Sequence, residues 1–414
     1  MQLFNARNIG SSELLEAVSL EYAPVSRRMP TDKRRVLVLS EIIAPYRIPV
    51  FNALAQHEGV NLHVVFLAET HAGLRQWRVY KDEIAFSHEV LPSWRFLTGK
   101  YDLLLNSGLR SCLNKFAPQT IICGGYNYIA SWEALWWKQR HQAELVLWSE
   151  SNSQDARRGR AWVESLKAYF IARCERFVVP GKTSSEYLES LGSAQKDILI
   201  APNAVDNVWF KTRGDEIRRR AAEFRESRGL PTRFVLFSGR LVREKGVFDL
   251  LEAYAKLESD TRSQIGLVFA GDGFCKTELE QRAKRISPGV VCFPGFAQRE
   301  DLAGFYALAE ALILPTHSDP WGLVVNEAMA CGLPIIVSSV AGCSADLVKD
   351  GWNGYIVPPG DSEKLSEAIN SLVRQPELRE RMSARSAEWI QHYSPEACAN
   401  GLAVAAIGAG RGTQ

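Results

Sequence analysis

Residues 233–254, RFVLFSGRLVREKGVFDLLEAY, contain a strand pattern, a turn and a helix pattern in direct succession. The apolar run that ends at Gly239 predicts a buried strand, and the apolar spacing that begins after Gly246 predicts a helix. The cations Arg240 and Lys245 lie in the intervening turn. Such a turn suits a phosphate or diphosphate, because backbone N–H groups, the helix dipole and the cations all attract an anion. Taken alone, the segment fits two solvated cations beside a turn better than an anion site, and it lacks the P-loop spacing.

Alternating strand and helix patterns fill most of the chain on both sides of this segment. Strand-like apolar runs occur at 34–42, 60–68, 120–125, 144–150, 176–181 and 197–203 before it, and at 265–273, 290–296, 311–316, 334–339 and 354–360 after it. Helical spacing separates most of these runs, which is typical of parallel sheets covered by helices on both faces.

The pattern restarts after Phe210, which indicates two similar halves. The predicted fold class is therefore α/β, with two Rossmann-like, doubly wound domains facing across a cleft at the carboxyl ends of their strands, where such sheets bind ligands. A helix is also expected at 11–22. The predicted parts of the chain are a poorly ordered extension at 1–33, a first domain at 34–206, a second domain at 207–385, and a final helix at 386–414 that crosses back to the first domain.

Composition and charge exclude several classes of protein. A chain of 414 residues with 46% hydrophobic and 23% charged residues is ordinary for a globular protein of about two domains. The net charge of +2 provides no global field for nucleic acid. The eight cysteines have no C-x-x-C spacing, which favours reduced thiols, and neither an export signal nor a membrane-length apolar run is found. The sequence therefore predicts a cytoplasmic protein with no nucleic-acid partner.

The stretch HSDPWGLVVNEAMACGLPII, at 317–336, contains two carboxylates eight residues apart, Asp319 and Glu327. Asp319 precedes a proline and is therefore expected to be the N-cap of a helix over 320–331. Glu327 lies among small and apolar residues, so it is expected to be partly buried and to need hydrogen-bond donors, which sugar hydroxyls would supply. The two acids fit a glycosidase pair, a ligand-binding pair or two ordinary helix residues.

Signals for metals and cofactors are weak. The seven histidines have no metal-ligand spacing, and no Asp-x-Asp pair occurs. The G-x-G at Gly271 has Lys276 where a dinucleotide fingerprint needs a third glycine. We therefore expect neither a metal nor a cofactor.

Five motifs together resemble glycosyltransferase family 4, a group of retaining, nucleotide-sugar-dependent enzymes with the two-domain GT-B fold that includes enzymes of bacterial polysaccharide and glycolipid assembly. The resemblance is in register from Ala201 to Asp361, is fair over the final helix and is weak over 33–200. The motifs are G-R-L-x-x-x-K-G at 239–246, G-D-G at 271–273, F-P-G-F at 293–296, D-P-W-G-L-V-x-N-E-A-M-A-C-G-L-P at 319–334 and D-G-x-N-G-Y-I-V-x-P-G-D at 350–361.

The resemblance implies roles for residues of the second domain. Arg240 and Lys245 bind the donor diphosphate and stabilise it as it leaves, Asp319 lies close to the donor sugar's hydroxyls, and Glu327 holds the nucleotide ribose. The remaining donor-binding positions that it implies are Gly239, Trp321, Gly322 and Leu323 for sugar and phosphate, and Gly295 and Phe296 near the base.

The second domain departs from the family pattern in two motifs. The first acid is Asp319 where the family usually has Glu. The Gly-Gly loop of this domain is AGCSADLV at 341–348, with Cys343 in place of a glycine and Asp346 in place of Glu.

The first domain gives fewer signals. The loop after its first strand, SEIIAPYRIPVFNAL at 40–54, lacks the family's Gly-Gly pair, but Tyr46 and Arg47 are expected to face the cleft and contact an acceptor. Asn127 and Glu150, each near the end of a strand, are further acceptor-side candidates or simply close turns.

Tryptophan clusters at 92–105 and 131–141 stand beside Lys and Arg. They fit either core packing with solvated cations or peripheral contact with an anionic membrane.

The predicted function is that of a hexosyltransferase. It moves a hexose-type sugar from a nucleotide diphosphate donor to a hydroxyl of a glycan or lipid-linked acceptor, with retention at the anomeric carbon. A sugar-nucleotide epimerase, a phosphorylase and a non-catalytic scaffold of the same fold are the alternatives. The expected location is the cytoplasm, either free or in peripheral contact with the inner face of the membrane.

Overall fold

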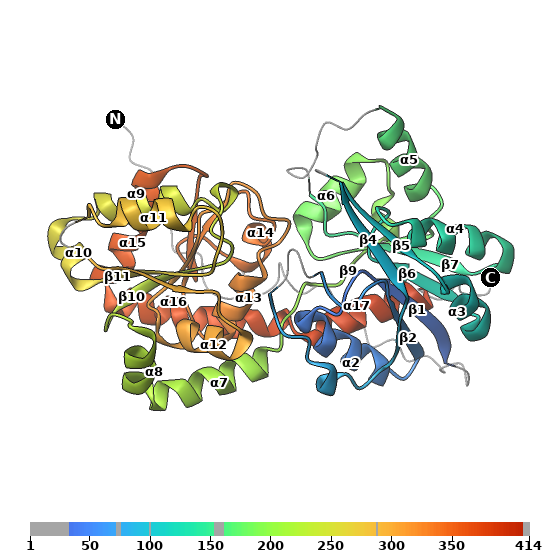
Figure 1. Ribbon diagram of the computed structural model, residues 1–414, viewed down its shortest axis with the longest axis horizontal. Coiled ribbons are helices and arrows are strands. Elements are labelled where there is room, and N and C mark those ends of the chain that lie inside the picture. The colour runs from blue at the N-terminus through green and yellow to red at the C-terminus, as the bar shows by residue number, and fades with distance from the viewer. Residues whose placement is uncertain (1–32, 72–75, 99–100, 153–160, 287–288, 409–414) are drawn as a thin grey trace, which may run out of the picture.

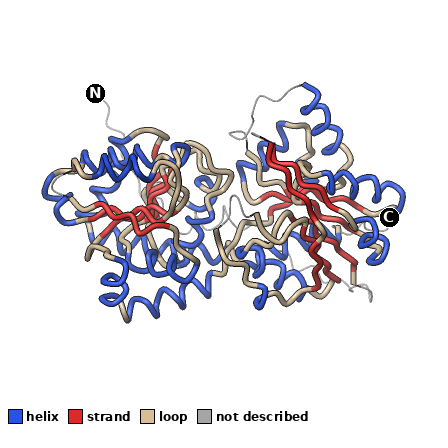
Figure 2. The backbone as a smooth tube through the Cα atoms, in the orientation of Figure 1, coloured by secondary structure: helices blue, strands red, loops and turns tan. Residues whose placement is uncertain are grey.

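The structure is a computed structural model with two lobes, each built around a sheet that helices cover (Figures 1 and 2). It describes residues 33–71, 76–98, 101–152, 161–286 and 289–408. The helix expected at 11–22 and most of the predicted extension lie outside these residues. Within them, no helix is both long enough and apolar enough to cross a membrane.

The N-terminal domain is built on seven parallel strands in the order β3-β2-β1-β6-β7-β8-β9. Val36 and Val38 of β1 belong to one buried cluster, whereas Leu37 and Leu39 belong to another, so both faces of the sheet are covered. The strands are β1 (Arg34–Ser40), β2 (Val60–Phe66), β3 (Ser87–Val90), β6 (Thr120–Cys123), β7 (Glu144–Trp148), β8 (Arg176–Val179) and β9 (Ile198–Ile200). The helices are η1 (Pro45–Arg47), α2 (Ile48–Gln56), η2 (Lys81–Glu83), α3 (Leu109–Phe116), α4 (Ile129–His141), α5 (Ala161–Ile171), α6 (Lys182–Ser190) and η4 (Gln195–Asp197).

The C-terminal domain has six parallel strands in the order β12-β11-β10-β13-β14-β15. Alternate residues of β10, Leu236 and Phe237, again enter separate buried clusters on the two faces. The strands are β10 (Phe234–Ser238), β11 (Gly266–Ala270), β12 (Val291–Gly295), β13 (Leu312–Leu314), β14 (Ile335–Ser338) and β15 (Gly354–Val357). The helices are α7 (Asn207–Arg219), α8 (Ala221–Arg228), η5 (Arg243–Lys245), α9 (Val247–Lys256), α10 (Ser259–Gln264), α11 (Lys276–Ala283), α12 (Arg299–Leu308), α13 (Leu323–Ala330), α14 (Ser344–Leu347), α15 (Ser362–Arg374), α16 (Pro376–Trp389) and η6 (Ile390–His392). The last helix, α17 (Pro395–Ile407), belongs to the N-terminal domain by its contacts. The two doubly wound α/β domains predicted from the sequence are confirmed.

The chain passes between the domains twice. The first passage ends at Asp206, whose side chain accepts a hydrogen bond from Trp209 N–H at 2.8 Å and caps α7. The second passage follows α16, which runs to Trp389, so the predicted domain boundary at residue 385 falls inside a helix. Ser394 then caps α17, which packs against α2 and four strands of the N-terminal domain (Figure 1).

The sequence did not predict β3 or an antiparallel hairpin of β4 (Ser93–Thr98) and β5 (Tyr101–Asn106). The hairpin lies over the front of the N-terminal domain in Figure 1. Trp94 and Phe96 are more than half exposed, whereas Arg95 between them forms an ion pair with Glu41 at 3.0 Å. The alternation within β4 therefore places two aromatic side chains in solvent and the cation against the domain.

Candidate active site

The turn that follows β10 is shaped by two glycines. Gly239 has φ +148° and its N–H donates to Ala270 O at 3.0 Å. Gly246 has φ +66° and forms the N-cap of α9. A Cβ atom at Gly246 would lie 1.9 Å from the carbonyl oxygen of Pro315, so the turn touches the segment that leaves β13. This close approach brings Lys245 beside residues 316–319.

Lys245 and Asp319 form an ion pair. The Lys245 ammonium donates to Asp319 Oδ2 at 2.6 Å and to the Ser318 carbonyl at 3.2 Å. The two side chains are only 15% and 17% exposed, so the pair is shielded from solvent on most sides. Arg240, by contrast, is exposed, and its guanidinium forms no hydrogen bond or ion pair with any residue that the structure describes. The third cation of the turn, Arg243, pairs with Glu278 at 2.9 Å. Arg240 is therefore the cation of this turn that has no partner among the described residues.

The prediction that Asp319 is a helix N-cap is wrong. Helix α13 begins at Leu323, and its N-cap is Gly322 with φ +97°. The Asp319 carboxylate instead accepts from Trp321 N–H at 3.2 Å as well as from Lys245. The chain makes a turn through Pro320 before the helix starts, because the segment is also bonded to the loop at residues 341–343.

The loop at 341–343, with the sequence Ala-Gly-Cys, packs against the turn at Asp319. Gly342 N–H donates to Asp319 O and Cys343 N–H donates to Trp321 O, both at 3.0 Å. A Cβ atom at Gly342 would lie 1.8 Å from Pro320 O, so this position requires glycine, whereas the Cys343 side chain fits in the buried core. The substitution of cysteine for the second glycine thus leaves the backbone contact in place.

The Trp321 side chain belongs to the core. It is 3% exposed, and its Nε1 donates to Asn326 Oδ1 at 2.8 Å. Asn326 in turn donates to Asn203 O, in the passage between the domains. The Trp321 side chain is therefore not available to a ligand.

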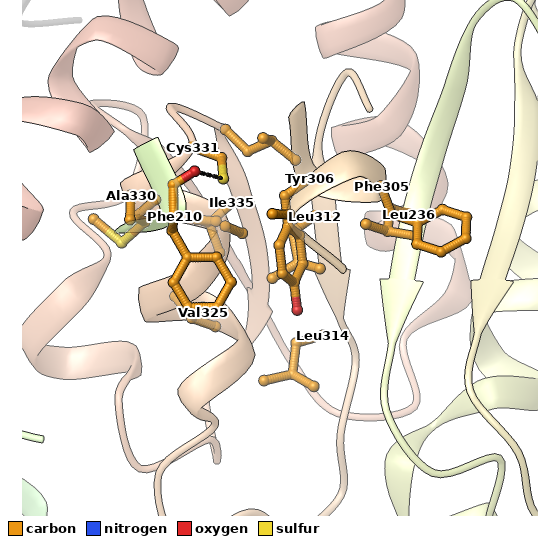
Figure 3. Close-up of a cluster of buried hydrophobic side chains, with 14 of the residues drawn as sticks. Phe210, Leu236, Phe305, Tyr306, Leu312, Leu314, Val325, Ala330, Cys331 and Ile335 are labelled. Atoms are coloured by element: carbon orange, nitrogen blue, oxygen red, sulfur yellow. Dashed lines mark hydrogen bonds between the residues drawn. The ribbon is translucent and has the colours of Figure 1, made fainter. Parts of the chain in front are cut away.

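Glu327 is paired with a residue that the sequence reasoning missed. Tyr306, on α12, donates its hydroxyl to Glu327 Oε2 at 2.7 Å and lies 3.1 Å from Ser238 Oγ at the end of β10. Tyr306 is fully buried among apolar side chains that include Phe210 and Leu314 (Figure 3). The sequence feature that could have indicated Tyr306 is a tyrosine within an apolar helical run. Such a tyrosine is expected to be buried, and a buried hydroxyl needs a hydrogen-bond partner. Burial raises the pKa of Glu327 to about 7, although the Tyr306 hydrogen bond opposes the shift.

Replacement of Glu327 with Gln is expected to change how stability depends on pH. Because the pKa of this carboxyl rises from 4.5 to about 7 on folding, the folded protein binds a proton that the unfolded chain releases. The contribution of Glu327 to the free energy of unfolding should therefore fall as pH rises between these values, and Glu327→Gln should remove that fall. Urea unfolding of both proteins without ligand, across this pH window, measures the difference. Parallel pH profiles of wild type and variant would contradict the prediction.

Three glycines lie at the ends of neighbouring strands. Gly271 N–H donates to Gly295 O at 2.8 Å, and a Cβ atom at Gly271 would lie 1.8 Å from Gly239 O. Gly295 itself has φ +86° and is followed by Phe296, which is 43% exposed. At the carboxyl edge of β10, β11 and β12 the chain therefore presents glycine backbone, with the exposed Phe296 ring beside it.

A pocket of about 280 Å³ opens at the carboxyl ends of β1, β6 and β7 in the N-terminal domain. Its lining includes all four acceptor-side candidates, Tyr46, Arg47, Asn127 and Glu150. Pro320 of the C-terminal domain also lines it, so the pocket adjoins Asp319. Arg47 bonds to Glu150, and its guanidinium carbon lies 3.7 Å from the centre of the Trp148 ring. Glu150 is thus held in an ion pair.

The domains also touch on both sides of this region. Asp346 accepts from Lys182 N–H at the start of α6, at 3.2 Å to each oxygen, and burial raises its pKa to about 6. Asp346, which departs from the family's Glu, therefore takes part in a contact between the domains. On the other side Arg299 pairs with Glu83. Helices α6, α13 and α14 line the facing sides of the two lobes (Figure 1).

One group in the described part of the chain has the composition of a metal site. His63, Glu89 and Cys112 have ligand atoms within 4.8 Å of one another. These residues lie on β2, β3 and α3, and none of them lines the pocket or the turn at 239–246. The group lies apart from the candidate active site.

Comparison with solved structures identifies the fold. Anabaena HepE in complex with UDP-glucose matches 89% of this chain and 98% of its own, with a TM-score of 0.68 and 18% identity. WaaG, a glycosyltransferase involved in lipopolysaccharide biosynthesis, matches 90% of this chain and 100% of its own, with a TM-score of 0.62 and 16% identity. The fold is GT-B. The GT-B fold predicted from the sequence is therefore confirmed.

Sequence comparisons point to the C-terminal domain of this GT-B chain. Residues 219–389 match the family described as "Glycosyl transferases group 1", a range that includes Arg240, Lys245, Asp319 and Glu327. The alpha-D-kanosaminyltransferase of Streptomyces kanamyceticus is 36% identical over 43% of this chain, and the chain spans about half (46%) of that enzyme's length. The glycogen synthase of Mycobacterium tuberculosis is 25% identical over 72% of this chain and 71% of its own length.

Proposed function

We propose that this protein is a retaining glycosyltransferase of family 4, which transfers a hexose-type sugar from a nucleotide diphosphate donor to a hydroxyl of a glycan or lipid-linked acceptor. One observation carries the proposal. The Lys245–Asp319 pair lies next to Pro320, and Pro320 lines the pocket of the other domain, so a cationic turn and a second ligand pocket adjoin each other. Transfer between two substrates requires such an arrangement. The match of residues 219–389 to group 1 glycosyl transferases supports the proposed transferase activity.

The donor is proposed to bind along the carboxyl edge of the C-terminal sheet. Arg240, whose guanidinium has no partner among the described residues, and Lys245 bind the diphosphate. Asp319 accepts from the donor sugar, and the Glu327 oxygen that Tyr306 does not occupy accepts from the ribose. The backbone surface at Gly239 and Gly295, together with Phe296 and the backbone of 321–323, completes the donor site.

The reaction is proposed to proceed by departure of the diphosphate and attack from the same face. The bond between the anomeric carbon and the phosphate oxygen breaks, and its electron pair stays on the phosphate. Arg240 and Lys245 stabilise the charge that develops there, and preorganised charge of this kind is commonly the largest catalytic contribution. The acceptor hydroxyl forms the new bond and gives its proton to the leaving phosphate. The scheme needs no metal and no cofactor.

A screen of UDP, GDP, ADP and dTDP sugars tests the proposed function. We expect consumption of one class of donor, with release of the nucleoside diphosphate and formation of a product glycoside. Interconversion of the sugar without transfer would identify an epimerase instead. Absorbance from a bound pyridoxal cofactor would identify a phosphorylase. If no donor raises the melting temperature, the protein would be a non-catalytic scaffold.

We further propose that the N-terminal domain contacts the inner face of the membrane from the cytoplasm, through the β4–β5 hairpin. Trp94 and Phe96 are 55% and 52% exposed on this hairpin, and exposed aromatic side chains suit a membrane interface. In the cluster at 131–141, Lys138 is buried and pairs with Glu175 at 2.5 Å, so this lysine is not available to a membrane. In a flotation assay at low salt, we expect binding to anionic vesicles and its loss when Trp94 and Phe96 are both replaced with Ala. Absence of wild-type binding would contradict this proposal.

A further inference from the structure

The pocket at the ends of β1, β6 and β7 is lined by aromatic rings and by two carboxylates. The acids are Glu41 and Glu150. The aromatic lining residues are Tyr46, Trp77, Tyr126 and Trp148. At about 280 Å³ the pocket is small compared with sites for drug-sized ligands, which are about 300–1,000 Å³, so it suits a single ring.

The single cation in the lining of the pocket is already paired with a carboxylate. Among its lining residues, all of which the structure describes, Arg47 is the single Lys or Arg. Its side chain is 13% exposed, it bonds to Glu150, and it lies over the Trp148 ring. Arg95, which pairs with Glu41, lies outside the lining. The lining therefore carries two acids and one base, and the base is already engaged.

Glu150 keeps one oxygen for a ligand. Its side chain is 36% exposed, and Arg47 bonds to Oε1. No described residue donates to Oε2. Since a carboxylate accepts several hydrogen bonds, Oε2 is suited to a hydroxyl of a molecule in the pocket. Arg47, fixed by Trp148, holds the carboxylate in place for this contact.

We infer that this pocket binds an uncharged sugar ring of the acceptor, and that Glu150 positions this ring by accepting a hydrogen bond from one of its hydroxyls. The inference rests on the proposed function and adds the chemical class of the acceptor group. A carboxylate or phosphate on the ring would face Glu41 and Glu150 without a free cation, which costs free energy. An apolar chain would remove water from Glu150 Oε2 without supplying a hydrogen-bond donor to it. A neutral ring satisfies both demands, because its hydroxyls donate to the acids and its C–H faces pack on aromatic rings.

The test compares neutral and anionic sugars on the full protein without donor. The probes are methyl glucoside, galactoside and mannoside, each paired with the uronate that carries a carboxylate at C6. Ligand-observed NMR measures their affinities. We expect at least one neutral glycoside to bind, and its uronate to bind about 10-fold more weakly or worse. Equal or tighter binding of the uronates, or no binding of any neutral glycoside, overturns the inference.

A variant locates the effect at Glu150. Glu150→Gln should weaken binding of the neutral glycoside by about 10-fold and should raise the KM for the acceptor more than it lowers kcat. Glu58→Gln, at an exposed carboxylate outside the pocket, is the matched control. Unchanged acceptor KM in Glu150→Gln counts against the inference. Failure of this inference can be distinguished from failure of the proposed function. Donor binding in the C-terminal domain is measured independently, by thermal shift with nucleoside diphosphates.

Discussion

Lys245→Ala is expected to lower sugar transfer by about 10²–10³-fold, the usual cost of removing one preorganised charge from a transition state. Lys245 is held at 2.6 Å from Asp319 and is 15% exposed, so its position is fixed before a donor arrives. Loss of the ammonium removes charge that the departing diphosphate needs, and neighbouring Arg240 alone supplies the rest. Initial rates with saturating donor and acceptor measure the effect.

Controls separate this loss from a loss of folding. Lys284→Ala, at an exposed lysine that follows α11, changes the net charge equally and should leave transfer unchanged. The double variant Lys245→Ala with Asp319→Asn should recover any stability lost by leaving the carboxylate unpaired, but it should not recover transfer. Transfer by Lys245→Ala within about 3-fold of wild type would contradict the diphosphate site, because catalytic charges contribute far more than that.

Gly246→Ala is expected to destabilise the C-terminal domain strongly, by about 3 kcal/mol or more. Gly246 has φ +66°, which a residue with a side chain adopts only at a cost of about 1–2 kcal/mol. In addition, the new Cβ would lie 1.9 Å from Pro315 O, a distance that forces the backbone of the turn or of the strand end to move. Such a shift also displaces Lys245, the preceding residue. Chemical unfolding followed by circular dichroism measures the change.

Gly229→Ala is the matched control for this prediction. Gly229 has φ +61°, nearly the same backbone conformation, but a Cβ atom there meets no atom within 4 Å. It should therefore show only the conformational cost of about 1–2 kcal/mol. If the two variants lose the same stability, the contact of Gly246 with Pro315 is not a constraint on the turn.

The sequence predicted the strands of both sheets better than the segments between them. Strands such as β10 and β6 are short apolar runs bounded by glycine or polar residues, and this pattern reflects burial on both faces. The hairpin β4–β5 was missed because its sequence was interpreted as an amphipathic edge. A strand that is exposed on one face has the same mixture of polar and apolar residues. The start of α13 was placed at Pro320 for a similar reason. Asp followed by Pro is a strong local signal for a helix start, but contacts with the loop at 341–343 held the chain in a turn.

The candidate site was predicted in part. Arg240, Lys245, Asp319 and Glu327 were selected by their motifs, and the structure places the first three on one edge of the C-terminal sheet. Tyr306 was missed, since nothing in its own segment distinguishes a tyrosine that bonds to a carboxylate from one that fills a core. The four acceptor-side candidates were chosen from strand ends, and they line one pocket because the ends of parallel strands meet at one edge.

The sequence by itself determined the alternation of strand and helix in both sheets apart from β3, the two-domain division and the glycines at which the chain turns tightly. These features are local, because periodicity and backbone conformation depend on residues a few positions apart. The tertiary structure alone decided the partners of the charged groups. Lys245 and Asp319 are 74 positions apart in the chain, Tyr306 and Glu327 are 21 apart, and Arg47 and Glu150 are 103 apart. Coulombic attraction and desolvation depend on distance and burial in space, so the pairing of each cation and the raised pKa of Glu327 exist only once the sheets have brought these side chains together.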